Sequence, residues 1–389
     1  MSRVADIVTT CEELYEDLEF SACRAWKEEA PGRHAIGYLP MWVPREIIHA
    51  AGMLPVGILG GGDKLEIIRG DAFFQSYICH LPRSVIELVL KGNLDFLDGC
   101  LFPSICDIVR NLSGMWQLLR PDTYVRYVDV PQNFEPDRGG RFFRTELRKL
   151  IDDLGGIAGR PVTDDALKHS IELYDENRRL IRGLYGRRSA VPWLVPTSEV
   201  YLVQRAGMVL PVEAHNDLVR EYLAAAEMDD RPERDNSRVV VSGAFCEQPP
   251  LDLIRTLERA GCYVVDDDFM LVNRWFAQDV ARPGDPVDAL VTAFLEQGIA
   301  NPARYEPHAG TKGQDLIECV RRRDADGIIF AAPSFCDPAL LERPMLQKAV
   351  EAAGIPSTAF KYSENTGQLQ PIREQAGTFS DSVKLWSSV

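Results

Sequence analysis

The sequence predicts an α/β protein with two doubly wound, Rossmann-like lobes, each built on a parallel sheet. Short apolar runs typical of buried strands alternate with amphipathic helical patterns in residues 33–140, and the same alternation returns in residues 236–389. Between these stretches, residues 141–235 carry apolar residues at helical spacing and no convincing strand. Residues 1–32 are expected to form an N-terminal helical segment. These four ranges are the expected domains of the chain.

The elements expected in each lobe follow one another as strand and helix. In the first lobe, strands are expected at residues 34–39, 54–59, 96–102 and 124–130, and helices at 45–51, 85–91 and 107–118. In the second lobe, strands are expected at 238–245, 263–265, 327–331 and 357–362, and helices at 250–260 and 339–353. Pro44 suits the first position of its helix because proline has a fixed φ and lacks an N–H.

Composition excludes several classes of protein. The 389 residues carry a formal net charge of −15, which argues against binding to duplex nucleic acid, since phosphate contacts need clustered Lys and Arg. No stretch is long and apolar enough to predict a membrane span, and the first residues lack the pattern of a secretory signal. A cytoplasmic location is therefore expected.

A five-residue pattern, P-S-x-C-D, occurs once in each lobe, at Pro103–Asp107 and at Pro333–Asp337. Each copy follows a buried strand pattern and leads into a helix. In an open parallel sheet, ligands bind at the carboxyl ends of the strands, beside helix N-termini whose dipole lowers the pKa of a thiol. If the lobes face each other, Cys106 and Cys336 converge in the cleft between them. The alternative is that both are ordinary buried or loop thiols.

The other cysteines divide into core thiols and weaker candidates. Core or helix positions are expected for Cys11, Cys23, Cys100, Cys262 and Cys319. Cys246 also follows a strand and is a weaker candidate ligand, and no local signal marks Cys79. The absence of any C-x-x-C pair argues against a tetrahedral zinc site. Scattered single cysteines suit a cluster held between domains better.

Six segments carry a resemblance to a known family, and the resemblance covers essentially the whole chain. They are GYLPMWVPREIIHAAGMLPVGILGGG (Gly37–Gly62), GDAFFQSYICHLPRS (Gly70–Ser84), LFPSICDIVRNLSGMW (Leu101–Trp116), FCEQPPLDLI (Phe245–Ile254), FAAPSFCDPALLERPML (Phe330–Leu346) and YSENTGQLQPIREQAGTF (Tyr362–Phe379). The chain resembles the 2-hydroxyacyl-CoA dehydratase component family. Within it, the gamma (C) subunits of class I, ATP-dependent benzoyl-CoA reductases are the closer match.

The resemblance implies an iron–sulfur site. Members of the family hold a 4Fe–4S cluster by three cysteines, and the matching positions here are Cys79, Cys106 and Cys336. In the related dehydratases, the remaining iron is ligated by water, a small ligand or the substrate carbonyl oxygen. An open iron of this kind implies a site at which the substrate meets the cluster directly.

The resemblance also implies partners. These are a homologous beta subunit, alpha and delta ATPase subunits that bind ATP and Mg, a reduced ferredoxin as electron donor, and benzoyl-CoA as substrate. The sequence has no G-x-x-x-x-G-K-[ST] motif, which agrees with ATP being bound by partners. The implied reaction is an oxidoreductase step that converts benzoyl-CoA to a cyclohexadiene-carbonyl-CoA by one-electron and proton transfers.

Such a reaction needs a proton donor near the ring. His80, next to Cys79, and His215 are the two candidates, although solvated or core histidines are commoner than catalytic ones. Two other functions stay open at this point. One is a component of a 2-hydroxyacyl-CoA dehydratase with the same kind of cluster, because fold alone does not choose between the two chemistries. The other is a non-catalytic scaffold subunit whose thiols are all structural.

Overall fold

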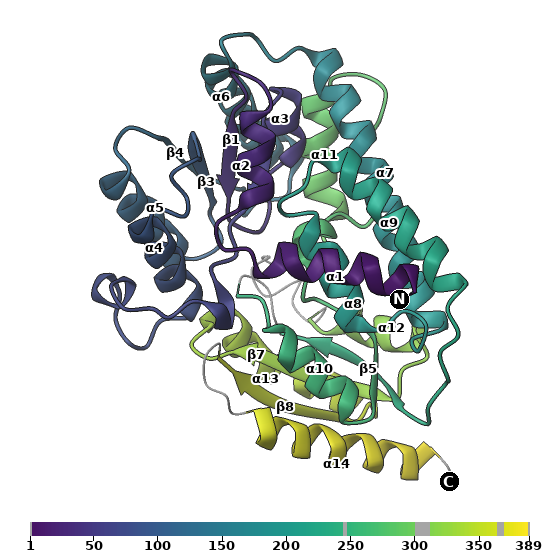
Figure 1. The fold of residues 1–389 in the computed structure, drawn as a ribbon. Coiled ribbons are helices and arrows are strands. Elements are labelled where there is room, and N and C mark those ends of the chain that lie inside the picture. Colours follow the sequence, from purple (N-terminus) through teal and green to yellow (C-terminus); the bar gives the residue numbers. More distant parts are fainter. Residues whose placement is uncertain (1, 244–246, 300–311, 364–368, 388–389) are drawn as a thin grey trace.

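The computed structural model describes residues 2–243, 247–299, 312–363 and 369–387. Within these residues it forms two four-stranded sheets in which every strand pair is parallel. Figure 1 shows one sheet in the upper part of the view and the other in the lower part, with α7 and α9 along the right side. The predicted α/β class with two doubly wound lobes is confirmed. The exact domain boundaries stay a prediction.

The first lobe follows two N-terminal helices, α1 (Arg3–Glu16) and α2 (Ser21–Glu28). Its strands are β1 (Ala35–Tyr38), β2 (Leu54–Gly57), β3 (Gly99–Pro103) and β4 (Tyr124–Val128). Its helices are α3 (Arg45–Ala50), α4 (His80–Lys91) and α5 (Asp107–Leu119). The strands lie in the order β2-β1-β3-β4.

The segment between the lobes is helical, and the second lobe returns to alternating strands and helices. The helices between the lobes are α6 (Arg141–Ala158), α7 (Asp164–Ala190), α8 (Thr197–Ala206) and α9 (Val212–Glu227). The second sheet contains β5 (Ser237–Ser242), β6 (Cys262–Asp267), β7 (Gly327–Pro333) and β8 (Ser357–Tyr362) in the order β6-β5-β7-β8. Its helices are α10 (Leu251–Arg259), α11 (Pro286–Gln297), α12 (Gln314–Arg322), α13 (Asp337–Ala352) and α14 (Leu369–Ser387).

Continuous burial explains why the strand sequences are almost wholly apolar. Every residue of β1, β2, β3 and β7 is buried, as expected for parallel strands covered by helices on both faces. Local signals fix several helix ends: the Thr163 hydroxyl accepts a hydrogen bond from the Ala166 N–H at the start of α7. Gly92 and Gly159 end α4 and α6 in the left-handed conformation that glycine adopts without strain.

The elements around the sequence motifs begin at different residues than predicted. Helix α4 starts at His80 rather than Val85, because Pro82 falls in the first turn, where an N–H has no partner within the helix. Strand β3 starts at Gly99 rather than Phe96, and Pro44 caps α3 instead of occupying its first position. The early start of α4 has a functional consequence, because it makes Cys79 the N-cap residue.

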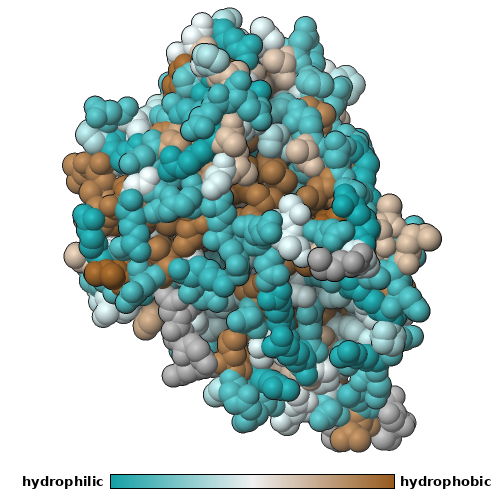
Figure 2. Space-filling view, in the orientation of Figure 1, coloured by the Kyte–Doolittle hydropathy of each residue, from teal (hydrophilic) through white to brown (hydrophobic). Residues whose placement is uncertain are grey.

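One hydrophobic core joins the lobes and the helical segment, and a smaller cluster lies on the α12 and α13 side of the second sheet. Figure 2 shows a mostly hydrophilic face on which hydrophobic residues appear in patches over the first lobe. Among the described residues, no helix combines the length and hydropathy that crossing a membrane requires.

Candidate functional site

The two P-S-x-C-D segments occupy equivalent places in the two lobes. Pro103 ends β3 and Pro333 ends β7, and each cysteine that follows is the N-cap of a helix, Cys106 for α5 and Cys336 for α13. The serine N–H of each segment donates to a carbonyl at the end of the neighbouring strand. Ser104 donates to the Val128 carbonyl at 2.9 Å, and Ser334 donates to the Tyr362 carbonyl at 2.6 Å. The internal repeat is therefore a repeat of structure.

Sheet topology gives these cysteines a position suited to ligand binding. In each sheet, the chain first adds a strand on one side and then crosses over to continue on the other. The direction of winding reverses between β1 and β3, and between β5 and β7. Ligands of open α/β sheets bind outside the carboxyl ends of the strands at this switch point. Cys106 and Cys336 follow β3 and β7, and therefore lie at the switch point of each lobe.

Cys79 joins these two thiols from a third helix N-terminus. It caps α4, which packs against α5 in the first lobe. Burial is the main cause of the raised pKa of the Cys79 thiol, and nearby Glu247, Cys336 and Cys106 raise it further. Burial likewise raises the pKa of Cys336, with smaller contributions from Glu247 and Cys106. Residues from distant parts of the chain, on two lobes, thus lie within electrostatic reach of one another.

The expected lowering of the thiol pKa by the helix N-termini is wrong for the protein alone. Burial raises the pKa of Cys336 to about 12, and it raises the pKa of Cys79 and Cys106 as well. Backbone N–H groups of α5 and α13 work in the opposite direction at Cys106 and Cys336, but desolvation is the larger effect. The thiols are therefore protonated at neutral pH, and a metal that binds them must displace their protons.

The donor set is made of sulfur. Among the described residues, no three His, Cys, Asp or Glu side chains group closely enough to hold one metal ion. The three candidate ligands are all cysteines, and thiolates are soft ligands that bind thiophilic metals. Cys246, the weaker candidate, lies outside the described residues.

The remaining described cysteines behave as expected for packing residues. Complete burial is found for Cys11, Cys23, Cys100 and Cys262. Cys319 is partly exposed on α12, and burial raises its pKa to about 12. No feature of these sites distinguishes them from core thiols.

Glu247 is a residue of the site that the sequence pattern does not single out. Its carboxylate Oε2 accepts hydrogen bonds from the His80 N–H at 2.7 Å and the Leu81 N–H at 3.4 Å. It thereby connects the second lobe with the start of α4, at the two residues that follow Cys79. The sequence does place an acidic residue just beyond a strand at the switch point. It does not show which helix that residue contacts, so Glu247 could not be assigned to the site from sequence alone.

The two candidate proton donors lie in different surroundings. His80 is the first residue of α4, 8% exposed, and adjoins Cys79. His215 lies among α7, α8 and α9, where its Nδ1 accepts from Asn177 Nδ2 and its Nε2 donates to the Val203 carbonyl, both at 2.9 Å. Burial lowers the pKa of His215 to about 4. A ring that is neutral and bonded at both nitrogens is a poor proton donor.

His215 leads to a prediction about stability and pH. The pKa of His215 is about 4 in the folded chain, whereas the ordinary pKa of a histidine side chain is 6.5. Between these values the unfolded chain binds a proton that the folded chain does not. The free energy of unfolding should therefore fall as pH falls through this window, by about 2 kcal/mol between about pH 7 and about pH 5. Urea unfolding at the two pH values measures it. His215→Gln should have a smaller pH dependence, and an equal dependence in both proteins would contradict the prediction.

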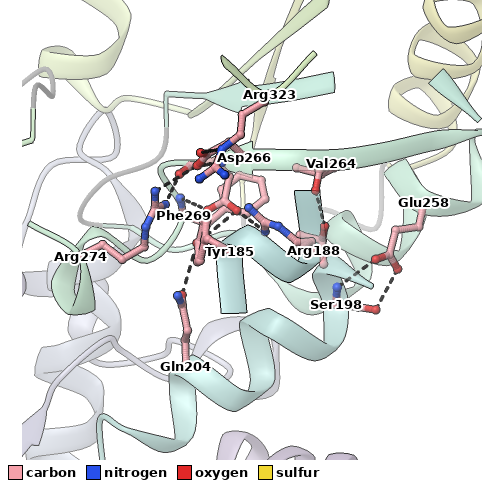
Figure 3. Close-up of polar contacts among 12 residues, drawn as sticks. Tyr185, Arg188, Ser198, Gln204, Glu258, Val264, Asp266, Phe269, Arg274 and Arg323 are labelled. Carbon is pink, nitrogen blue, oxygen red and sulfur yellow. Dashed lines mark hydrogen bonds and ion pairs between the residues drawn. The ribbon is translucent and has the colours of Figure 1, made fainter. Parts of the chain in front are cut away.

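A cluster of buried charges lies at the end of β6, and none of the three candidate ligands belongs to it (Figure 3). Asp266 accepts from Arg274 Nη2 at 3.0 Å and from Arg323 Nε at 2.7 Å, and the Arg274 guanidinium lies 3.5 Å from the centre of the Tyr185 ring. The residues border a cavity of about 580 Å³, whose described lining includes none of the three candidate ligands. Tyr185 and Arg188 of α7 both donate hydrogen bonds to Asp267 of β6, so the cluster links α7 to the second lobe.

The chain belongs to the family described as "2-hydroxyglutaryl-CoA dehydratase, D-component", whose model matches residues 40–383. Within this class it is similar to the C subunit of benzoyl-CoA reductase from Thauera aromatica, with 58% identity over 98% of this chain and 99% of that protein. It is also 27% identical to the beta subunit of (R)-phenyllactyl-CoA dehydratase from Clostridium sporogenes, over 91% of this chain and 93% of that one. The chain is 28% identical to the beta subunit of (R)-2-hydroxyglutaryl-CoA dehydratase from Acidaminococcus fermentans. This match covers 92% of this chain and 94% of that protein.

Proposed function

We propose that the chain is the C subunit of an ATP-dependent benzoyl-CoA reductase, an oxidoreductase made of several different subunits. The observation that carries this proposal is the 58% identity to the C subunit of a benzoyl-CoA reductase over nearly the full length of both chains. The reaction is the reduction of benzoyl-CoA to a cyclohexadiene-carbonyl-CoA by one-electron and proton steps, in the anaerobic degradation of aromatic compounds.

The proposed cofactor is a 4Fe–4S cluster held by Cys79, Cys106 and Cys336. Support comes from the mutual electrostatic influence of the three thiols and from a donor set made of sulfur. When bound, such a cluster supplies single electrons at low potential. The three side chains bind it and release their protons in doing so. Helix N-termini behind Cys106 and Cys336 contribute N–H groups toward the thiolates.

The residues around the thiols define the remaining tasks of this chain. Cys336 is buried, and Cys79 and Cys106 are partly buried, which limits the access of water to the three thiols. His80 is the proposed proton donor, since it adjoins Cys79, and His215 is the less favoured of the two. The homologous beta subunit, the alpha and delta ATPase subunits with their ATP and Mg, and a reduced ferredoxin complete the proposed cytoplasmic enzyme.

A dehydratase component is the second candidate function. The two relatives at 27% and 28% identity are dehydratase beta subunits, and they also match more than nine-tenths of the chain. The greater identity to the reductase subunit favours reduction over dehydration.

The proposal predicts where ATP is used. Because the chain has no P-loop motif, the isolated chain should neither hydrolyse ATP nor reduce benzoyl-CoA with a reduced ferredoxin. Both activities should appear when all partner subunits are added. Phosphate release and thioester products are measured anaerobically for the isolated chain and for the complex. ATP hydrolysis by the isolated chain would contradict the proposal that the partner subunits use the ATP.

A further inference from the structure

A buried carboxylate from the second lobe holds the start of the helix that carries Cys79. Glu247 is 1% exposed, and its Oε2 accepts the N–H groups of His80 and Leu81, the first two residues of α4. Hydrogen bonds to an ionised acceptor are about twice as strong as neutral ones. A negative charge at a helix N-terminus also interacts favourably with the helix dipole. Glu247 therefore fixes α4 at the end where the thiol lies.

The same residue is connected to the loop of Cys336. The backbone carbonyl of Glu247 accepts from the Tyr362 hydroxyl at 2.9 Å, and the Tyr362 carbonyl accepts from the Ser334 N–H at 2.6 Å. Tyr362 ends β8 and is 3% exposed. Hydrogen bonds through Glu247 and Tyr362 thus connect the helix capped by Cys79 in one lobe with the segment before Cys336 in the other.

Glu247 also acts on the thiols through its charge. Its carboxylate Oε2 lies 2.7 Å from the backbone nitrogen of His80, the residue that follows Cys79, so a charge on it acts on that ligand at short range. In a buried site such interactions are only weakly screened. A fixed negative charge makes the addition of an electron to a neighbouring cofactor less favourable and lowers its reduction potential.

We propose that Glu247 is a positioning residue, which sets Cys79 relative to Cys336 and whose negative charge lowers the reduction potential of the cofactor that they hold. The part about potential rests on the proposed function. The part about position concerns this chain alone and is tested without a cofactor.

The positioning role is tested by amide hydrogen exchange on the full chain after removal of iron. Glu247→Ala should raise the exchange rates of the His80 and Leu81 amides by about tenfold or more, because they lose a charged acceptor. Glu247→Gln keeps the shape of the side chain and should raise these exchange rates less. If the Ala variant does not fold, the Gln variant alone tests the positioning role.

Glu87 provides a matched control. It is 1% exposed on the same helix, and its carboxylate accepts the N–H groups of Ile68, Arg69 and Gly70. Glu87→Gln should leave the exchange of the His80 amide unchanged. Unchanged exchange at His80 in both Glu247 variants would overturn the positioning role.

The role of the charge is tested on anaerobically reconstituted protein by a redox titration followed by EPR. Glu247→Gln should retain the cluster and shift its midpoint potential upward, whereas Glu87→Gln should leave the midpoint at the wild-type value. Equal midpoints in the wild type and Glu247→Gln would overturn this role. A wild-type chain that takes up no cluster contradicts the proposed function, whereas the exchange measurement still decides the positioning role.

Discussion

Replacing Cys336 with Ala is expected to abolish binding of the iron–sulfur cluster. Cys336 caps α13 in the second lobe, whereas Cys79 and Cys106 lie in the first, so its thiol is the proposed attachment of the cofactor to that lobe. Without it, the protein offers the cluster two thiolates from one lobe. Iron and acid-labile sulfide per chain, determined after anaerobic purification, measure the loss. Cys79→Ala and Cys106→Ala should have the same effect.

Cys319 is the matched control for this experiment. It lies on α12 in the same lobe, and burial raises its pKa to about 12, as it does for Cys336. Cys319→Ala should keep the iron content of the wild type. Substitution of Cys11 or Cys23, which are buried helix residues, should also leave it unchanged. Full iron content in Cys336→Ala would refute the assignment of the ligands.

The second large effect is expected at Asp267, which is paired inside the protein with Arg188. The two side chains are 2% and 1% exposed, and Arg188 Nη1 lies 2.5 Å from Asp267 Oδ2. Asp267 also accepts from the Tyr185 hydroxyl at 3.1 Å and from the Phe269 N–H at 2.8 Å. Asp267→Ala leaves the guanidinium charge buried without its partner, which should lower the free energy of unfolding by about 3–5 kcal/mol.

Chemical denaturation followed by circular dichroism measures this loss. The control is Glu221→Ala, which removes the partner of Arg3 in an ion pair whose side chains are 49% and 61% exposed. Exposed pairs contribute little, so that variant should stay within about 1 kcal/mol of the wild type. A loss in Asp267→Ala no larger than in the control would show that the buried pair does not join α7 to β6 as described.

The parts of the structure that depend on local pattern were predictable from the sequence. Buried parallel strands are apolar throughout, and proline ends two of them, so the segments at Pro103 and Pro333 stood out as strand ends followed by helices. The equivalence of these segments follows from the common strand order of the two sheets. Cys106 and Cys336 could thus be placed at the same edge of their sheets from the sequence pattern.

Features that depend on long-range contact were not predictable in this way. Cys79 became a candidate only through family resemblance. It is a helix cap because α4 starts at His80, and the sequence pattern does not show this early start because Pro82 lies in the first turn. Glu247 meets α4 across the lobes, a contact with no local pattern. The raised thiol pKa values also reverse the local expectation, since the helix N-terminus is visible in the sequence and the depth of burial is not.

The proposed function is tested most directly by the products that the assembled enzyme forms from benzoyl-CoA. The chain is combined anaerobically with its beta, alpha and delta partners, ATP, Mg and reduced ferredoxin, and the thioesters are analysed by mass spectrometry. The expected product is a cyclohexadiene-carbonyl-CoA whose formation requires ATP and is lost with Cys106→Ala. Unchanged benzoyl-CoA, together with dehydration of a 2-hydroxyacyl-CoA by the same complex, would contradict the proposed function.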